Sequence, residues 1–482
     1  MYLTQVYPRP VSFVEKECSP YPFGASAILK LTSPIKPEAA EGIRFLWNRF
    51  SFTASELTIE QADCPQKGWT AVLGAPDFDE PKTDYYAISS NESGAIVSAV
   101  SEEALVNGLK TLVQLITPVS LGVGEEKLTL CPVEIADKPS MQFRSIHLCL
   151  FPESDVSTIE KAIELGGLLK LTHVVLEFWG IYPFETMKEL GWAGHCWKKE
   201  QVRALVDLCH LYNMEVIPMF NMLGHASQSR GGMGRHSVLN QNPRLQLYFE
   251  PDGWTWCVSN PDTQKLMADL IEELCELCGS GSYFHIGCDE ADSFATCPIC
   301  KRQAHGELLA EHIRRLTDRL GALGRRPIMW HDQLIRRRDF ASATDCSVVA
   351  NGDDTYRALD LIDRRVIIAD WQYGYVNEKN PTTPYFMEKG FDTILCPWDN
   401  LNNILSLSES ARRLNAYGVM LTTWHHLPAF TRRLYEAANM LWCDCSSGYP
   451  KTGHNDAAAI LRKVHASPRF EESGWNKIEV EQ

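Results

Sequence analysis

Two adjacent carboxylates stand among three cysteines in the run YFHIGCDEADSFATCPIC. Asp289 and Glu290 could act as an acid, a base or a charge-stabilising group in a hydrolytic reaction. Cys288, Cys297 and Cys300 could instead bind a metal or serve as reactive thiols. The chemistry of this protein therefore depends on whether the carboxylates or the sulfur atoms act here.

The spacing of four cysteines resembles a zinc site, with Cys275 and Cys278 followed by Cys297 and Cys300. The first pair ends a predicted helix and the second pair follows a predicted strand. A strand of about seven residues separates them by ~23 Å, which zinc–sulfur bonds of ~2.3 Å cannot bridge. Cys278 also fits the apolar stripe of its helix, which favours a place in the core.

The pair Cys297 and Cys300 leaves two alternatives open. It could bind a metal together with Cys196 or Cys257 from another loop, or it could be two unpaired thiols. Our prediction for the reaction itself is that it needs no metal and no cofactor.

The elements that position these residues begin near Phe143, where short apolar runs alternate with helical patterns such as that from Leu309 to Leu323. Mostly apolar runs are typical of parallel strands covered by helices. Eight strand-helix units over roughly 300 residues indicate an α/β fold, a (β/α)8 TIM barrel. CSVVANGDD, between the fifth and sixth runs, is an alternative strand. The eight runs are FRSIHLCL, HVVLEFW, EVIPMFN, YFHIGCDE, RPIMWHD, VIIADWQYG, DTILCPWD and GVMLTTWHH.

The preceding residues lack this rhythm and predict a small α+β N-terminal domain at 1–138. DYYAISS and GAIVSAV read as a hairpin across Asn91–Gly94, and EEALVNGLKTLVQLI reads as an amphipathic helix. We expect the barrel at 139–445 and a C-terminal loop and helix at 446–482.

Composition narrows the classes of partner. The 482 residues carry a formal charge of −15, which disfavours nucleic acid. No apolar run approaches the length of a membrane span. Sixteen scattered cysteines without a visible export signal favour reduced thiols in a cytoplasmic protein.

The active site of a TIM barrel lies at the carboxyl ends of its strands. Here those ends combine carboxylates with tryptophans, which suits a sugar, because indole faces stack on C–H groups and carboxylates accept hydroxyl hydrogen bonds. Each tryptophan alone also fits packing at the barrel rim, but their recurrence at matching positions favours a sugar site. The residues at these ends include Glu177, Trp179, Asn221, His225, Asp289, Glu290, Trp330, Asp332, Trp371, Tyr373, Trp398 and Trp424.

The run HIGCDE resembles the catalytic motif of glycoside hydrolase family 20, the β-N-acetylhexosaminidases. LEFWGIYPFE is similar to a segment of the hexosaminidase D-like branch, and VIPMFNMLGH to the third-strand segment of the family. PVEIADKPSMQFRSI resembles the passage from that family's N-terminal domain to its barrel. The resemblance implies an exo-acting enzyme that removes terminal GlcNAc or GalNAc from a glycan.

The same resemblance implies substrate-assisted, retaining hydrolysis, in which the 2-acetamido oxygen of the sugar is the nucleophile. Glu290 then is the general acid/base, Asp289 orients the acetamide, and His225 supports the acid. Neighbouring strand residues point to opposite faces, so both carboxylates can serve one substrate only if the strand has ended or bulged there.

The resemblance also implies a set of sugar contacts. Arg144 and Glu177 would bind hydroxyl groups, and Tyr373 or Tyr375 would complete a clamp around the acetamide. The further residues assigned to substrate binding are Trp330, Asp332, Trp371, Trp398 and Trp424.

Two positions depart from the family pattern. Cys149 and His425 stand where acidic residues that bear on O4 and O6 recognition are usual. The choice between GlcNAc and GalNAc therefore stays open. The alternatives are a glycosidase of the same fold with another sugar specificity, a non-catalytic carbohydrate-binding relative, and a zinc-dependent protein. We expect a glycan that contains N-acetylhexosamine as partner, no nucleic acid, no membrane, and a homodimer as one alternative for assembly.

Overall fold

The computed structural model describes most of the chain, including all eight predicted barrel strands. The predicted C-terminal segment at 446–482 lies outside the described residues, as does His425. The described residues are 6–22, 27–51, 56–63, 68–73, 84–120, 126–151, 154–192, 194–226, 238–340, 348–376, 380–424, 427 and 431–443.

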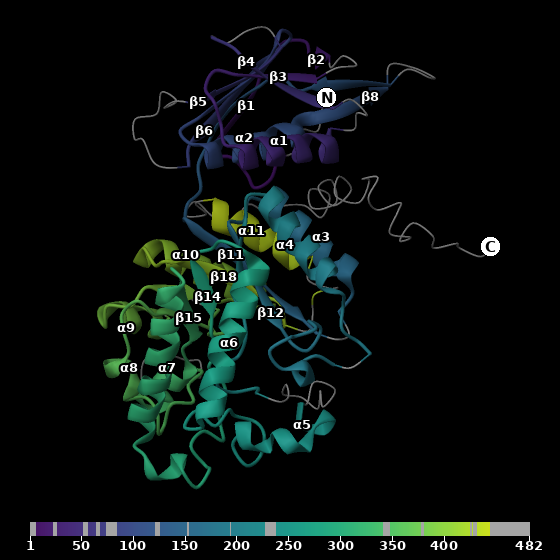
Figure 1. The fold of residues 1–482 in the computed structure, drawn as a ribbon. Coiled ribbons are helices and arrows are strands. Elements are labelled where there is room, and N and C mark those ends of the chain that lie inside the picture. The colour runs from purple at the N-terminus through teal and green to yellow at the C-terminus, as the bar shows by residue number, and fades with distance from the viewer. Residues whose placement is uncertain are drawn as a thin grey trace, which may run out of the picture.

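Eight strands, each parallel to its neighbours, close into a barrel, as the sequence predicted (Figure 1). The described part of CSVVANGDD forms no strand. The barrel strands are β11 (Phe143–Leu150), β12 (His173–Phe178), β13 (Glu215–Met219), β14 (Tyr283–His285), β15 (Arg326–Trp330), β16 (Ile367–Asp370), β17 (Thr393–Leu395) and β18 (Gly418–Thr422).

Helices surround the barrel and cover the outward faces of its strands (Figure 1). Because both faces are covered, all eight residues of β11 are buried. The side chain of Asn260 caps α6 by accepting from Asp262 N–H at 2.9 Å, and Gly324 follows α7 with φ +72°. The helices are α3 (Val156–Leu168), α4 (Lys199–Leu211), α5 (Val238–Gln241), α6 (Pro261–Cys278), α7 (His305–Ala322), α8 (Ala358–Leu361), α9 (Thr382–Glu388), α10 (Leu401–Leu414) and α11 (Thr431–Trp442).

Short 3-10 helices lie in the loops between these elements. The 3-10 helices are Lys188–Leu190, Pro243–Tyr248, Cys300–Arg302, Asp332–Leu334 and Arg337–Asp339.

None of the described helices combines the length and hydrophobicity that a membrane crossing requires.

The N-terminal part forms a seven-stranded mixed sheet in the order β1-β10-β6-β7-β5-β3-β4, and a smaller sheet in the order β2-β9-β8. The predicted hairpin is confirmed as β6 and β7, and the predicted helix as α2. Figure 1 shows α1 and α2 between the larger sheet and the barrel. The elements are β1 (Ser12–Glu15), β2 (Tyr21–Pro22), β3 (Ala27–Leu31), α1 (Pro37–Phe50), β4 (Leu57–Gln61), β5 (Gly68–Leu73), β6 (Tyr86–Asn91), β7 (Gly94–Ala99), α2 (Glu102–Leu115), β8 (Ile116–Ser120), β9 (Glu126–Leu130) and β10 (Val133–Asp137).

A buried polar network joins the N-terminal sheet to the amino end of the barrel. Lys170 Nζ donates to Asp137 Oδ2 at 3.1 Å and to the Tyr86 hydroxyl at 2.7 Å. Trp442 Nε1 donates to Asp137 Oδ1 at 2.9 Å, so both carboxylate oxygens have partners. Burial lowers the pKa of Lys170, although the charge of Asp137 opposes this. The network fixes the two parts of the chain against each other.

Arg144 belongs to this network, which corrects its predicted role in sugar binding. It is the second residue of β11, and its guanidinium donates to Lys170 O at 3.0 and 3.1 Å and to Met141 O at 2.5 Å. The guanidinium also lies 4.9 Å from the ring centre of Trp442. Burial lowers the pKa of Arg144 to about 10. Arg144 therefore lies at the amino end of the barrel, away from the carboxyl ends of the strands.

Candidate active site

The two adjacent carboxylates lie in a loop that begins where β14 ends, at His285. Gly287, Cys288 and Glu290 have φ values of +65°, +71° and +46°, so the extended geometry of the strand has ended. The alternation of a strand therefore no longer separates Asp289 from Glu290. Their side chains instead converge on one neighbouring residue.

That neighbour is His225, in the loop that follows β13. Its Nε2 lies 3.3 Å from Glu290 Oε2 and 3.5 Å from Asp289 Oδ2. The rings of Trp254 and Trp179 flank it, with ring centres 4.6 and 5.5 Å away. Burial lowers the pKa of His225, but the two carboxylates raise it further, to about 10. The imidazole is therefore a cation at neutral pH.

Asn221 and Gly224 hold Asp289 in place. Asn221 Nδ2 donates to Asp289 Oδ1 at 2.5 Å, while Asn221 Oδ1 accepts from Cys288 N–H at 2.9 Å. A Cβ atom at Gly224 would lie 2.0 Å from the carbonyl oxygen of Asp289, so a side chain there would push the loop away. The loop after β13 thus fixes the position of the Asp289 carboxylate.

Asp332 lies behind the pair, and it is fully buried. Its Oδ2 accepts from Glu290 N–H and from Asn351 Nδ2, both at 2.9 Å, and Trp371 Nε1 donates to its Oδ1 at 3.4 Å. Burial and the charge of Asp289 raise the pKa of Asp332 to about 6. A carboxylate without exposed surface cannot contact a sugar, so the predicted binding role of Asp332 is wrong and it positions Glu290 instead.

Aromatic rings from three strand ends meet around Tyr373. Its hydroxyl accepts from Trp424 Nε1 at 2.8 Å, and its ring centre lies 5.3 Å from those of Trp371 and Trp398. All four side chains are partly exposed. Tyr375 is almost completely buried, so Tyr373 is the tyrosine that can face a ligand.

Trp330 requires a further correction. It was predicted to form part of the aromatic wall, but it has no exposed surface. Its ring packs 4.4 Å from that of His285 and 5.8 Å from that of Trp424. Trp330 is the last residue of β15 and belongs to the core cluster inside the barrel. Trp424 packs against this cluster, so Trp330 supports Trp424 from the barrel interior.

Glu177 forms a second polar group beside the first. His147 Nε2 lies 2.9 Å from Glu177 Oε2, and Cys149 Sγ donates to the same oxygen at 3.3 Å. Burial alone would raise the pKa of Glu177, but hydrogen bonds with His147, Trp179 and Cys149 lower it. The ring of His147 lies 4.9 Å from that of Trp424, which connects this group to the aromatic cluster.

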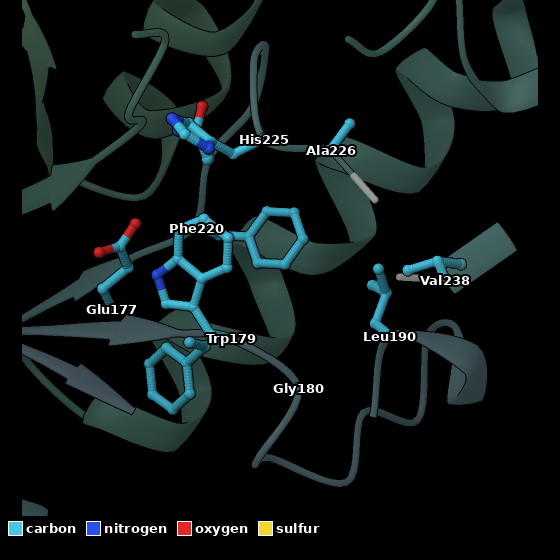
Figure 2. A pocket seen from close by; sticks show the side chains of 10 residues that line it. Glu177, Trp179, Gly180, Leu190, Phe220, His225, Ala226 and Val238 are labelled. Carbon is cyan, nitrogen blue, oxygen red and sulfur yellow. The ribbon is translucent and has the colours of Figure 1, made fainter. Parts of the chain in front are cut away.

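A narrow cavity of about 30 Å³ opens beside Glu177, Asn221 and His225. Figure 2 shows Glu177, Trp179 and His225 around one end of it, and Leu190, Ala226 and Val238 around the other. Space of this size holds about one or two water molecules.

The model of the glycosyl hydrolase family 20 catalytic domain matches residues 174–437, more than half of the chain. This chain belongs to glycosyl hydrolase family 20. The match begins within β12 and ends within α11, and it includes both carboxylates, His225 and the aromatic cluster.

Two curated relatives agree with this family. Human hexosaminidase D is 24% identical over 207 residues, which cover 40% of this chain and 40% of that protein. Mouse beta-hexosaminidase subunit beta is 23% identical over 274 residues, which cover 51% of this chain and 48% of that protein. The chain thus spans about half the length, or less, of the curated relatives it matches.

Solved structures of family 20 proteins share the fold. Flavobacterium johnsoniae chitobiase gives a TM-score of 0.70 at 18% identity and covers 99% of this chain and 74% of its own. The beta-N-acetylhexosaminidase from Bacteroides fragilis gives 0.69 at 18% identity, with 98% and 96% covered. Coverage this complete includes the N-terminal sheet as well as the family 20 barrel.

No role was assigned from the sequence to three residues of this family 20 site. Asn221 stood at a predicted strand end, and that polar position was the signal for it. His147 lies two residues before Cys149, a spacing that places both on one face of β11. Trp254 gave no such signal, because it lies in an irregular loop. Its role is clear only from the structure, where its Nε1 donates to Glu290 O at 2.5 Å.

Proposed function

We propose that this family 20 protein is an exo-acting β-N-acetylhexosaminidase that removes terminal GlcNAc or GalNAc by substrate-assisted, retaining hydrolysis. The observation that carries the proposal is the single imidazole of His225 within 3.3 and 3.5 Å of two adjacent carboxylates. Two carboxyl groups on one side of a substrate suit a reaction in which neither is the nucleophile.

The two carboxylates differ in a way that divides the work between them. Asp289 is the more buried and is held by Asn221, so it can accept the acetamide N–H and stabilise the positive nitrogen of the oxazolinium. Its fixed position turns the acetamide carbonyl oxygen toward C1. Attack by this oxygen forms the C1–O bond as the glycosidic bond breaks, and the configuration inverts once.

Glu290 has a side chain that is 22% exposed, so it can reach the departing oxygen. As general acid it gives a proton to that oxygen, and as general base it then takes one from the water that opens the oxazolinium. This second inversion restores the original configuration. His225 lies beside both carboxyl groups and stabilises the negative charge of Asp289 and that of Glu290 once it has given up its proton.

A different sugar specificity on the same fold is the second candidate, and Cys149 favours it. This thiol donates to Glu177, which His147 already engages, so Glu177 has less capacity left for sugar hydroxyls. Recognition at O4 and O6 would then differ from that of relatives with an acidic residue at this position.

Hydrolysis of aryl β-GlcNAc, β-GalNAc and β-glucoside by the folded protein tests these proposals. We expect turnover of at least one N-acetyl substrate, none of the glucoside, and strong inhibition by a thiazoline that mimics the oxazolinium. Sugar binding without turnover would favour the carbohydrate-binding alternative. Turnover with weak thiazoline inhibition would indicate an ordinary carboxylate nucleophile. The cytoplasmic location and the homodimer stay predictions.

A further inference from the structure

Three cysteines and a glutamate converge outside the carboxylate site. Cys257 Sγ lies 3.6 Å from Cys297 Sγ and 3.8 Å from Cys300 Sγ. One carboxylate oxygen of Glu250 joins them, and the four atoms lie within 4.8 Å of one another. All four residues are buried, Glu250 and Cys300 completely.

The sulfur spacing agrees with a tetrahedral metal site. Zinc–sulfur bonds of ~2.3 Å at tetrahedral angles place two sulfur atoms ~3.8 Å apart. A disulfide requires ~2.05 Å. The observed separations of 3.6 and 3.8 Å thus match two ligands of one zinc ion and exceed a covalent bond.

Glu250 supplies an independent sign of a missing ligand. Its Oε2 accepts from Cys297 N–H at 2.5 Å and from Thr296 Oγ1 at 3.3 Å. Its Oε1 is buried and has no hydrogen-bond partner among the described residues. A fully buried carboxylate oxygen without a partner is costly unless a cation binds it.

The surroundings of the sulfur atoms also suit thiolates. Cys300 N–H donates to Cys297 Sγ at 3.3 Å, across the turn of the Cys-x2-Cys run. Ser259 Oγ lies 3.1 Å from Cys300 Sγ, so its hydroxyl can donate to a thiolate there. Donors of this kind orient and stabilise metal-bound sulfur.

We propose that Glu250, Cys257, Cys297 and Cys300 bind one structural zinc ion. Four protein ligands fill a tetrahedral shell and leave no open position for a substrate or water, which defines a structural site. Three thiolates, one carboxylate and Zn²⁺ sum to a charge of −2, as in a four-cysteine site. Thiolate ligands favour zinc over magnesium or calcium.

This proposal chooses the metal-binding alternative for Cys297 and Cys300, and it selects Cys257 as the partner from another loop. Cys196 lies elsewhere, where its Sγ donates to Gly180 O at 3.5 Å and Trp192 O at 3.3 Å. Cys278 is buried on α6, in agreement with the core position predicted for it.

The zinc would clamp the loop from Glu250 to Cys257 onto the loop from Asp289 to Cys300. Between the two, Ser293 Oγ also donates to Thr255 Oγ1 at 2.9 Å. The first loop carries Trp254, which contacts both His225 and Glu290 O. The metal therefore takes no part in the reaction itself and affects the carboxylates only by fixing the positions of the two loops.

Elemental analysis of the full chain, purified without added chelator and passed over a metal-scavenging resin, tests the site directly. We expect about one zinc per chain. Cys257→Ser should reduce this to near none, and Glu250→Gln should weaken zinc binding tenfold or more. The matched control Cys196→Ser should keep the full complement. Cobalt in place of zinc should give a thiolate-to-metal charge-transfer band.

The wild-type protein decides the question even if a variant does not fold. Folded wild-type chain without zinc, which also takes up none when reduced and incubated with Zn²⁺, would overturn the proposal. A disulfide between Cys257 and either other cysteine, found by thiol titration with mass spectrometry, would overturn it as well. None of these readouts depends on hydrolase activity.

Discussion

The two ends of the barrel both bury charged side chains, but these side chains are paired in different ways. At the amino end, Asp137 receives hydrogen bonds from Lys170 and Trp442, so the anion contacts a cation directly. At the carboxyl end, Asp289 and Glu290 share His225, and Asp332 lies directly behind them.

The difference separates charges that stabilise the fold from charges that can react. At the amino end, hydrogen-bond donors engage both carboxylate oxygens of Asp137. At the other end the two carboxylates raise the pKa of His225 to about 10, and burial together with the charge of Asp289 raises that of Asp332 to about 6. Shifts of this kind gather at functional sites, because like charges are held close together there at a cost to stability.

The largest effect we predict is on activity at the carboxyl end. Glu290→Gln removes the transferable proton but keeps the shape, so kcat should fall about 10²–10⁴-fold with little change in melting temperature. Steady-state assays and calorimetry measure both. Glu276→Gln, an exposed position on α6, is the matched control. A kcat within twofold of wild type would remove Glu290 from the mechanism.

At the amino end the effect should fall on stability instead. Lys170→Met leaves Asp137 buried without its cation and should lower the free energy of unfolding by about 3–5 kcal/mol. Urea denaturation measures this loss, and the folded fraction should keep its kcat. A large drop in kcat of the folded protein would show that the two ends are not separate in function.

The pH dependence of stability should report the charge on His225. Because its folded pKa of about 10 exceeds the ordinary 6.5, its protonation stabilises the fold fully below pH 6.5. This contribution is lost as the pH rises through 10. The difference in unfolding free energy between wild type and His225→Gln should therefore shrink from pH 6 to pH 10, while exposed His195→Gln shows no such trend. A constant difference would contradict a cationic His225.

The smallest effect on activity concerns Trp254, whose side chain positions Glu290 by a hydrogen bond to the backbone oxygen of Glu290. Trp254→Phe removes the indole N–H that donates to Glu290 O, a hydrogen bond of about 1 kcal/mol. We expect a kcat reduced about fivefold, since 1.4 kcal/mol corresponds to tenfold. A change in KM alone would assign Trp254 to substrate binding.

Much of this comparison could be predicted from the sequence. Strands buried on both faces give continuous apolar runs. From these runs the barrel and the position of the carboxylates at the end of β14 could be predicted. Arg144 was misassigned because its role came from the resemblance, although its place at the start of the run FRSIHLCL already put it near the amino end of β11. The role of Trp254 and the choice between Cys196 and Cys257 could not be predicted, because an irregular loop has no periodicity and its neighbours are set only by the tertiary fold.

Attack by the acetamide oxygen is tested most directly by the rate of hydrolysis across aryl glycosides with acetyl, fluoroacetyl, difluoroacetyl and trifluoroacetyl groups on the 2-amino nitrogen. Fluorine withdraws electrons from the carbonyl oxygen that we propose as the nucleophile. We predict that kcat/KM falls steeply with each added fluorine. A rate that is independent of fluorination would contradict it, because a carboxylate of the protein would then be the nucleophile.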